Sequence, residues 1–204
     1  MIENIYYMDR WVTLAVNGLY SSFSDAVFLV LSNKFFFAGV IAIFLLLCGS
    51  RKQLRFGKHN YQVNWKIMLT IAFFIAITFA ITDVVSHDVI KPTVRRLRPA
   101  YDPWIHNLVR TPSGRGGVYT FVSNHAANCF GFAILSALVI KNKFYAMSIV
   151  TICLAVCYSR IYLGRHFLTD VLGGAVFGLM VGAMTYSLLR FYVNRFLKSS
   201  RVNA

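Results

Sequence analysis

The sequence predicts an all-α, polytopic transmembrane helical bundle with five or six membrane helices and an N-terminal amphipathic helix. Of its 204 residues, 57% are hydrophobic and 14% are charged, whereas charged residues make up about 25% of an ordinary soluble domain. The mean hydropathy of +0.59 excludes an intrinsically disordered chain, which needs low hydrophobicity and high charge. The apolar residues also fall into long blocks, as in integral membrane proteins.

Five apolar blocks are candidates to cross the bilayer, whose core requires a helix of about 20 apolar residues. They cover residues 26–48, 65–90, 120–140, 144–158 and 167–189, and the fourth of them is the shortest. We expect a single integral-membrane domain over residues 1–204. Its transmembrane core is expected at residues 25–190, with a basic cytoplasmic tail at residues 191–204.

The N-terminal segment differs from the five blocks. Residues 5–20 carry apolar side chains at helical spacing but also contain Asp9, Arg10 and Asn17. This pattern predicts an amphipathic helix lying on the membrane surface, within an interfacial segment at residues 1–24. A sixth, poorly apolar span is the alternative interpretation.

The Lys and Arg residues predict the orientation in the membrane. With five spans, three basic segments lie on the same side of the membrane: the loop at residues 49–64, the turn containing Lys141 and Lys143, and the tail. The positive-inside rule makes this side cytoplasmic. Residues 91–119 break this rule, because this opposite segment is also strongly basic. The opposite orientation would place residues 91–119 in the cytoplasm, but it would move the three other basic segments to the outside. We therefore expect the outer charges to have a purpose.

The net charge of +14 fits loops that face anionic lipid, together with an anionic substrate, rather than nucleic acid. The ends of four apolar blocks are expected to lie at the same depth on the outer side of the membrane. All four ends carry basic or hydrogen-bonding side chains. Arg binds phosphate through paired N–H donors, and Lys adds a point charge. Other outer cations are expected to contact lipid phosphates in general; these are Arg95, Arg96, Arg110 and Arg115.

Two histidines on this side suit phosphoryl transfer. His166 and Asp170 are four residues apart and share a helix face, so the carboxylate is expected to accept the Nδ1–H of His166 and leave Nε2 free to attack. His125, in the first turn of another helix, is a candidate proton donor. The surrounding cations would stabilise the charge of the transferring group and repel a metal ion. We therefore expect neither a metal nor a cofactor.

Three motifs carry a resemblance to a known family. The segment KPTVRRLRP at residues 91–99 resembles the K-x6-R-P motif of type 2 phosphatidic acid phosphatases, and residues 159–170 are similar to their S-R-x5-H-x3-D motif. Residues 122–125 resemble the intervening P-S-G-H motif, with Val122 in place of Pro and Asn124 in place of Gly. The same family is related to vanadium-dependent haloperoxidases.

The resemblance implies a role for each matching residue. It makes His166 the nucleophile that forms a phosphohistidine, Asp170 the residue that orients it, and His125 the acid that protonates the leaving oxygen. Phosphate binding is implied for Lys91, Arg98, Ser123, the backbone N–H of Asn124, and Arg160. Gly permits a close backbone approach or positive φ, and Asn tolerates the left-handed region better than most residues. The donor at Asn124 is therefore expected to remain.

The implied function is a metal-independent lipid phosphatase of the bacterial cytoplasmic (inner) membrane, with its active site on the periplasmic side. Candidate substrates are undecaprenyl pyrophosphate, lipid A, phosphatidylglycerophosphate and phosphatidic acid. The Asn124 departure and the surface helix favour the first two. The alternatives are a lipid-to-lipid phosphotransferase, a non-enzymatic anion-binding membrane transporter, and a membrane haloperoxidase that binds vanadate. The expected partners are the lipid bilayer and the lipid phosphate, while the oligomeric state stays open.

Overall fold

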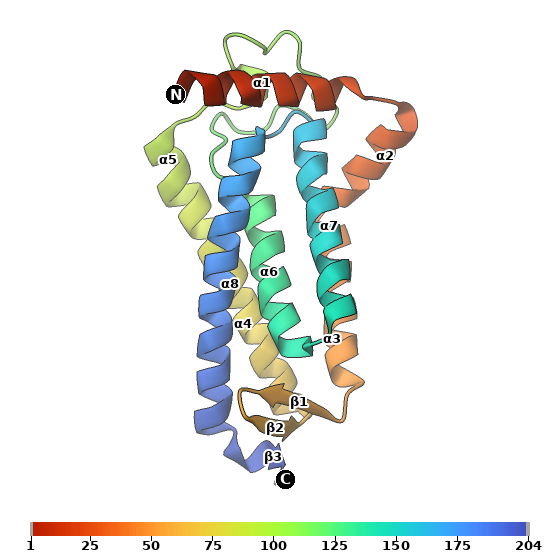
Figure 1. Ribbon diagram of the computed structural model, residues 1–204, viewed down its shortest axis with the longest axis vertical. Helices are drawn as coiled ribbons and strands as arrows, with labels where there is room; N and C mark the ends of the chain where they lie inside the picture. Colours follow the sequence, from red (N-terminus) through yellow and green to blue (C-terminus); the bar gives the residue numbers. More distant parts are fainter. Residues whose placement is uncertain (1, 203–204) are drawn as a thin grey trace.

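The computed structural model describes residues 2–202 as an elongated helical bundle with a helix across one end and a small sheet at the other (Figure 1). The helices are α1 (Ile2–Gly18), α2 (Ser22–Leu31), α3 (Lys34–Gly49), α4 (Trp65–Val84), α5 (Lys91–Val94), α6 (Asn124–Ile140), α7 (Lys143–Tyr162) and α8 (Leu168–Phe196). The strands are β1 (Gln53–Phe56), β2 (His59–Gln62) and β3 (Arg201–Val202). The expectation of a predominantly helical membrane bundle is therefore confirmed.

The predicted number of five or six spans is not confirmed by helix length and composition. Three helical stretches are long and apolar enough to cross a membrane, namely Trp65–Val94, Lys143–Tyr162 and Leu168–Phe196. A fourth span results if the segments Glu3–Gly18 and Ser22–Leu31, bent by 118°, are counted as one. Two apolar helices, Lys34–Gly49 and Asn124–Ile140, are shorter. By length and composition, the described residues thus supply three or four spans.

The first apolar block is not one continuous helix. It breaks between α2 and α3, where Asn33 adopts an extended conformation and its side chain accepts a hydrogen bond from Phe35 N (2.9 Å). Ser and Asn side chains compete with the helix for backbone hydrogen bonds and favour helix starts. The second block, in contrast, continues from α4 through a π-helical turn at Val85–Ile90 into α5. This extension places Lys91 at the end of the span.

The basic loop after α3 forms a hairpin, which the all-α prediction missed. β1 pairs antiparallel with β2, and β3 from the C-terminal tail pairs with β2. The period of two in a strand turns Leu54 and Phe56 inward and the intervening Arg55 outward. Tyr61 of β2 is also fully buried, and its hydroxyl donates to Asn194 Oδ1 of α8 (2.8 Å).

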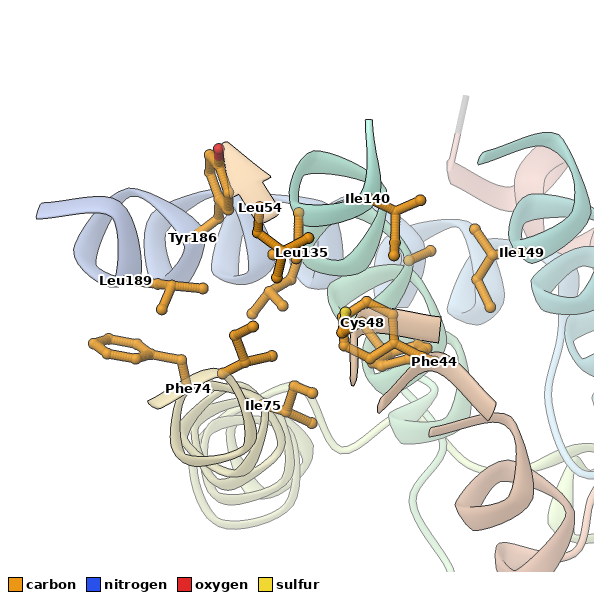
Figure 2. Close-up of a cluster of buried hydrophobic side chains, with 14 of the residues drawn as sticks. Phe44, Cys48, Leu54, Phe74, Ile75, Leu135, Ile140, Ile149, Tyr186 and Leu189 are labelled. Atoms are coloured by element: carbon orange, nitrogen blue, oxygen red, sulfur yellow. The ribbon is translucent and has the colours of Figure 1, made fainter. Parts of the chain in front are cut away.

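Helix α6 packs against α4, α7 and α8, and its contact with α8 is especially close. A Cβ added at Gly178 would lie 2.2 Å from the carbonyl oxygen of Ala127, and one at Gly182 would lie 2.2 Å from that of Gly131. Small residues of this kind allow two helix backbones to approach each other in a membrane bundle. Toward the sheet, the bundle is filled by a cluster of apolar side chains that includes Phe74, Leu135 and Leu189 (Figure 2).

The amphipathic helix predicted at the N-terminus is α1, and it lies across the end of the bundle opposite the sheet (Figure 1). Its polar face points inward: Asp9 and Asn17 are buried, whereas Tyr7 and Trp11 are 73% and 64% exposed. The Asn17 side chain donates to the carbonyl oxygen of Tyr162 at the end of α7 (2.6 Å). The polar residues therefore attach α1 to the protein and leave large apolar side chains such as Tyr7 and Trp11 outside.

Candidate functional site

Four helix ends converge beneath α1: the end of α5, the start of α6, the end of α7 and the start of α8 (Figure 1). A cavity of about 440 Å³ lies among them. Six of the eight predicted site residues line it, namely Lys91, Arg98, Asn124, His125, Arg160 and His166. The sequence motifs, separated by up to 75 positions from Lys91 to His166, therefore meet at one cavity.

His166 lies two residues before the start of α8 at Leu168, and it is 2% exposed. Asp170, in the first turn of α8, is fully buried behind it, and its Oδ2 lies 3.8 Å from Nδ1 of His166. The hydroxyl of Thr120 lies between them, 3.0 Å from Nδ1 and 2.6 Å from Oδ2. Asp170 Oδ2 also accepts a hydrogen bond from the backbone N–H of Phe167 (2.8 Å).

The second carboxylate oxygen of Asp170 binds Arg96 rather than the imidazole. The NH1 group of Arg96 donates to Asp170 Oδ1 (2.8 Å), and its NH2 group donates to Asp9 Oδ2 on α1 (2.6 Å). The expectation that Arg96 contacts lipid phosphates is therefore wrong, because its guanidinium points into the protein. Arg110 likewise forms an ion pair with Asp25 (2.7 Å) instead of staying free for lipid.

The cavity is strongly cationic. Lys91 and Arg160 are only 8% and 4% exposed, and within residues 2–202 neither they nor Arg98 forms an ion pair with a carboxylate. The side chain of Arg98 is held by the carbonyl oxygens of Tyr119 (3.1 Å) and Arg165 (3.5 Å). Burial, followed by the charge of Arg165, lowers the pKa of Arg98 to about 10. Such a group of cations, unpaired within the described residues, suits an anionic ligand.

The same surroundings keep His166 neutral. Burial, followed by the positive charges of Arg98, Arg160 and Lys91, holds the pKa of His166 well below its ordinary value. A neutral imidazole has one protonated and one unprotonated nitrogen. Because Nδ1 faces Thr120 and His166 lines the cavity, Nε2 is the nitrogen available to a ligand.

Asn124 occupies the position of the family Gly without unusual backbone geometry, since it is the first residue of α6. Its Oδ1 accepts a hydrogen bond from Lys91 Nζ, and its Nδ2 donates to Asp83 Oδ1 (3.1 Å). Asn128, one turn later, donates to the same oxygen of Asp83 (3.1 Å). Asn124 therefore links the phosphate-binding candidates to a polar cluster on α4 and α6.

The other two residues of this motif differ in position. Ser123 is fully buried and is not among the residues that line the cavity. Its hydroxyl accepts a hydrogen bond from the backbone N–H of Ala126 (3.5 Å) at the start of α6. His125 lines the cavity, and its Nε2 lies 3.2 Å from the carbonyl oxygen of Ser32 at the break between α2 and α3. The phosphate-binding role of Ser123 and the acid role of His125 both stay predictions.

A second cavity of about 370 Å³ adjoins the first and shares Asn124 and His125 with it. Its walls come from α2, α3, α4, α6 and α7 and are mainly apolar, with Leu31, Phe37, Ala38, Ile41, Phe79, Cys129 and Val156. Polar groups are Asn33 and Lys34 at the helix break, Asp83, and Asn128. The site thus combines a cationic compartment with an apolar one that has a polar rim.

Comparison with known proteins assigns this arrangement to a family. The model of the PAP2 superfamily matches residues 72–193, which include every motif residue described above. The chain belongs to the PAP2 superfamily. The resemblance to type 2 phosphatidic acid phosphatases seen in the motifs is therefore confirmed.

Individual PAP2 proteins are similar over nearly the whole chain. The lipid A 4'-phosphatase of Porphyromonas gingivalis is 31% identical over 200 residues, covering 98% of this chain and 80% of that protein. The lipid A 4'-phosphatase of Bacteroides thetaiotaomicron is 31% identical over 190 residues, covering 91% and 79%. The crystal structure of a transmembrane PAP2-type phosphatidylglycerolphosphate phosphatase from Bacillus subtilis has a TM-score of 0.65 at 20% identity, covering 95% of this chain and 89% of that one.

These PAP2 relatives are bacterial lipid phosphatases, and the chain is accordingly a membrane-associated hydrolase of the phosphoric monoester class. Sequence reasoning missed three residues near the site, namely Asp9, Arg96 and Thr120, as parts of one hydrogen-bonded chain. Thr120 lies 50 positions from its partner Asp170, and Asp9 lies 87 positions from its partner Arg96. No local spacing in the sequence indicates such a contact.

Proposed function

We propose that the chain removes a phosphate group from a lipid A-type phosphoglycolipid through a phosphohistidine on His166. The observation that carries this proposal is a neutral, oriented imidazole facing a cavity whose cations Lys91, Arg98 and Arg160 pair with no carboxylate among residues 2–202. The cations Lys91, Arg98 and Arg160 hold the phosphate by charge and paired N–H donors. Nε2 of His166 attacks phosphorus as the P–O bond to the lipid breaks.

His125 protonates the departing lipid oxygen in the first step. A water molecule then attacks phosphorus, His125 takes up a proton from it, and the N–P bond to His166 breaks. Inorganic phosphate leaves, and the imidazole returns to its neutral form. The cationic compartment stabilises the charge that spreads over the phosphoryl oxygens in both steps.

The second cavity supports the choice of a phosphoglycolipid. Its apolar walls suit an acyl chain, while the amide and carboxylate groups of Asn124, Asn128 and Asp83 suit hydroxyl and amide groups of a sugar headgroup. The two lipid A 4'-phosphatases that are 31% identical to the chain favour the same class. Lipid A is thus preferred to undecaprenyl pyrophosphate, phosphatidylglycerophosphate and phosphatidic acid.

We also propose that the site faces the periplasm from a bacterial cytoplasmic membrane. All seven acidic residues lie in the half of the chain's fold that contains the site, namely Glu3, Asp9, Asp25, Asp83, Asp88, Asp102 and Asp170. The opposite, sheet-containing end is basic, with Arg51, Lys52, Arg55, Lys58, Lys141, Lys143, Arg190, Arg195, Lys198 and Arg201. The positive-inside rule places this end in the cytoplasm.

Phosphate release by the purified protein in detergent, with EDTA present, tests the activity. The substrates are lipid A carrying a 4'-phosphate, phosphatidylglycerophosphate, phosphatidic acid and undecaprenyl pyrophosphate. We expect release mainly from lipid A and at least about 10³-fold slower turnover by His166→Ala, because removing a nucleophile abolishes the covalent route. The matched control is His59→Ala, since His59 lies on β2 at the far end of the molecule.

Each other result has a definite meaning. Equal release by wild type and His166→Ala contradicts the phosphohistidine mechanism. Preferential release from another lipid in the panel overturns the lipid A assignment and retains the chemistry. Transfer of labelled phosphate to a second lipid, without free phosphate, makes the chain a phosphotransferase that uses the same nucleophile.

A further inference from the structure

His166 and Asp170 do not touch each other in this structure. The 3.8 Å between Nδ1 and Oδ2 is too long for a hydrogen bond. The Thr120 hydroxyl fills the gap, with 3.0 Å to Nδ1 and 2.6 Å to Oδ2. All three side chains are buried. The nucleophile and its carboxylate are therefore connected through a third residue.

The proton positions in this chain follow from what each group is able to donate. Asp170 accepts from Phe167 N (2.8 Å) and from Arg96 NH1 (2.8 Å), which favours its ionised, acceptor-only form. The single hydroxyl proton of Thr120 therefore goes to Asp170. The Thr120 oxygen then accepts the proton on Nδ1 of His166. This arrangement fixes the tautomer that leaves the Nε2 lone pair free for phosphorus.

The carboxylate is in turn held from α1. Arg96 donates to both Asp170 Oδ1 (2.8 Å) and Asp9 Oδ2 (2.6 Å), and its guanidinium stacks 4.4 Å from the ring centroid of Phe167. Asp9 is fully buried and also accepts from the backbone N–H of Thr169 (3.1 Å). A helix at the other end of the sequence thus fixes the first turn of α8.

We propose that Thr120 is a positioning residue that transmits the orientation of Asp170 to His166, and that Asp9, acting through Arg96, holds Asp170 in place. The inference rests on the proposed function, because it takes His166 as the nucleophile. Thr120 and Asp9 touch no substrate in this scheme. Their effect is on the orientation of the imidazole and so on kcat.

The test compares Thr120→Ser, Thr120→Val and Thr120→Ala with wild type and His166→Ala, using the lipid that the wild type hydrolyses. Ser keeps the hydroxyl, whereas Val keeps the shape without it. We expect kcat to fall about 10- to 100-fold in Val and Ala, with KM changed less than about twofold, and Ser to stay within about threefold of wild type. Thermal unfolding of each variant identifies any that fails to fold. If Val is unfolded, the comparison of Ala with Ser decides the result.

A double-mutant cycle tests the link to α1. We expect Asp9→Asn to lower kcat in the wild-type background and to have little further effect in Thr120→Val, because that variant has already lost the connection to His166. Additive losses would show that Asp9 affects turnover independently of Thr120, and they would overturn the part of the proposal that concerns α1.

Two other outcomes separate this inference from the proposed function. Full activity in both Thr120→Val and Thr120→Ala, with His166→Ala inactive, overturns the role of Thr120 and leaves the phosphohistidine mechanism intact. Equal activity in wild type and His166→Ala overturns the proposed function, and the role of Thr120 falls with it.

Discussion

His166 combines two properties that a histidine nucleophile needs. It is 2% exposed and lies close to several cations, so the neutral imidazole is favoured. Its Nδ1 lies within hydrogen-bond distance of the Thr120 hydroxyl (3.0 Å), so Nε2 is the ring nitrogen that is free to react with phosphorus. A surface histidine would exchange between tautomers and would be partly protonated near neutral pH.

The buried neutral imidazole predicts a pH-dependent contribution to stability. The folded-state pKa of His166 is depressed below its ordinary value near 6.5, so below about pH 6.5 the unfolded chain takes up a proton that the folded chain excludes. Stability is therefore lost as pH falls below about 6.5, by at most about 1.4 kcal/mol per pH unit. We expect the melting temperature of wild type to fall more between pH 7 and pH 5 than that of His166→Gln. Parallel curves for the two proteins would contradict this prediction.

Much of the site was predictable from residue spacing, because the family motifs name the side chains that reach the cavity. Lys91, Arg98, Asn124, Arg160 and His166 all line it as the motifs implied. The contact partners behind them were not predictable. Whether an arginine such as Arg96 faces lipid or a buried carboxylate depends on how distant segments pack, and the sequence alone contains no such information.

At the scale of the helices, the distance between the candidate catalytic groups depends on two closely packed backbones. Helix α6 carries His125, and His166 and Asp170 lie at the start of α8. Glycines on α8 allow the approach, since the Cβ of any other residue at Gly178 would lie 2.2 Å from a carbonyl oxygen of α6. The separation of the proposed proton donor from the proposed nucleophile is thus set partly by residues that lie away from the cavity.

We expect Gly178→Ala to lower stability by about 1–3 kcal/mol, because the added methyl forces α6 and α8 apart. We also expect activity to fall, since the shift moves the two histidines relative to each other. The matched control is Gly39→Ala in α3, where nothing lies within 4 Å of the added Cβ and Ala favours a helix by about 1 kcal/mol. Thermal unfolding and phosphate release measure both effects. Equal melting temperatures for the two variants would contradict the packing argument.

The helices themselves were predicted with variable success, and the reason is physical. Apolar runs predict α4, α7 and α8 well, because burial in lipid or protein requires such runs. The break at Asn33 and the hairpin of β1 and β2 depend on short polar signals that are weak beside a long apolar block. The direction in which α1 turns its polar face is also not a local property, since its partners include Tyr162 and Arg96.

At the scale of the whole molecule, the two ends differ in charge and therefore in expected location. Cysteine labelling measures this directly, because all four native cysteines are buried. We expect a membrane-impermeant maleimide to label Leu108→Cys, in the exposed outer loop, on intact spheroplasts. Lys58→Cys, in the exposed hairpin turn, should be labelled only after the membrane is opened. The reverse pattern would invert the proposed orientation.

The sheet-containing end carries a larger net positive charge than the end with the cavity, and this difference has an electrical consequence. A bacterial cytoplasmic membrane is negative on its inner side, and moving one elementary charge across 100 mV changes the free energy by about 2.3 kcal/mol. If the molecule turned over, the more positive sheet-containing end would move outward against this voltage while the less positive cavity end moved inward, so the net change would be unfavourable. In the proposed orientation, the membrane potential of an energised cell therefore opposes turnover of the molecule and favours the phosphate cavity on the outer side.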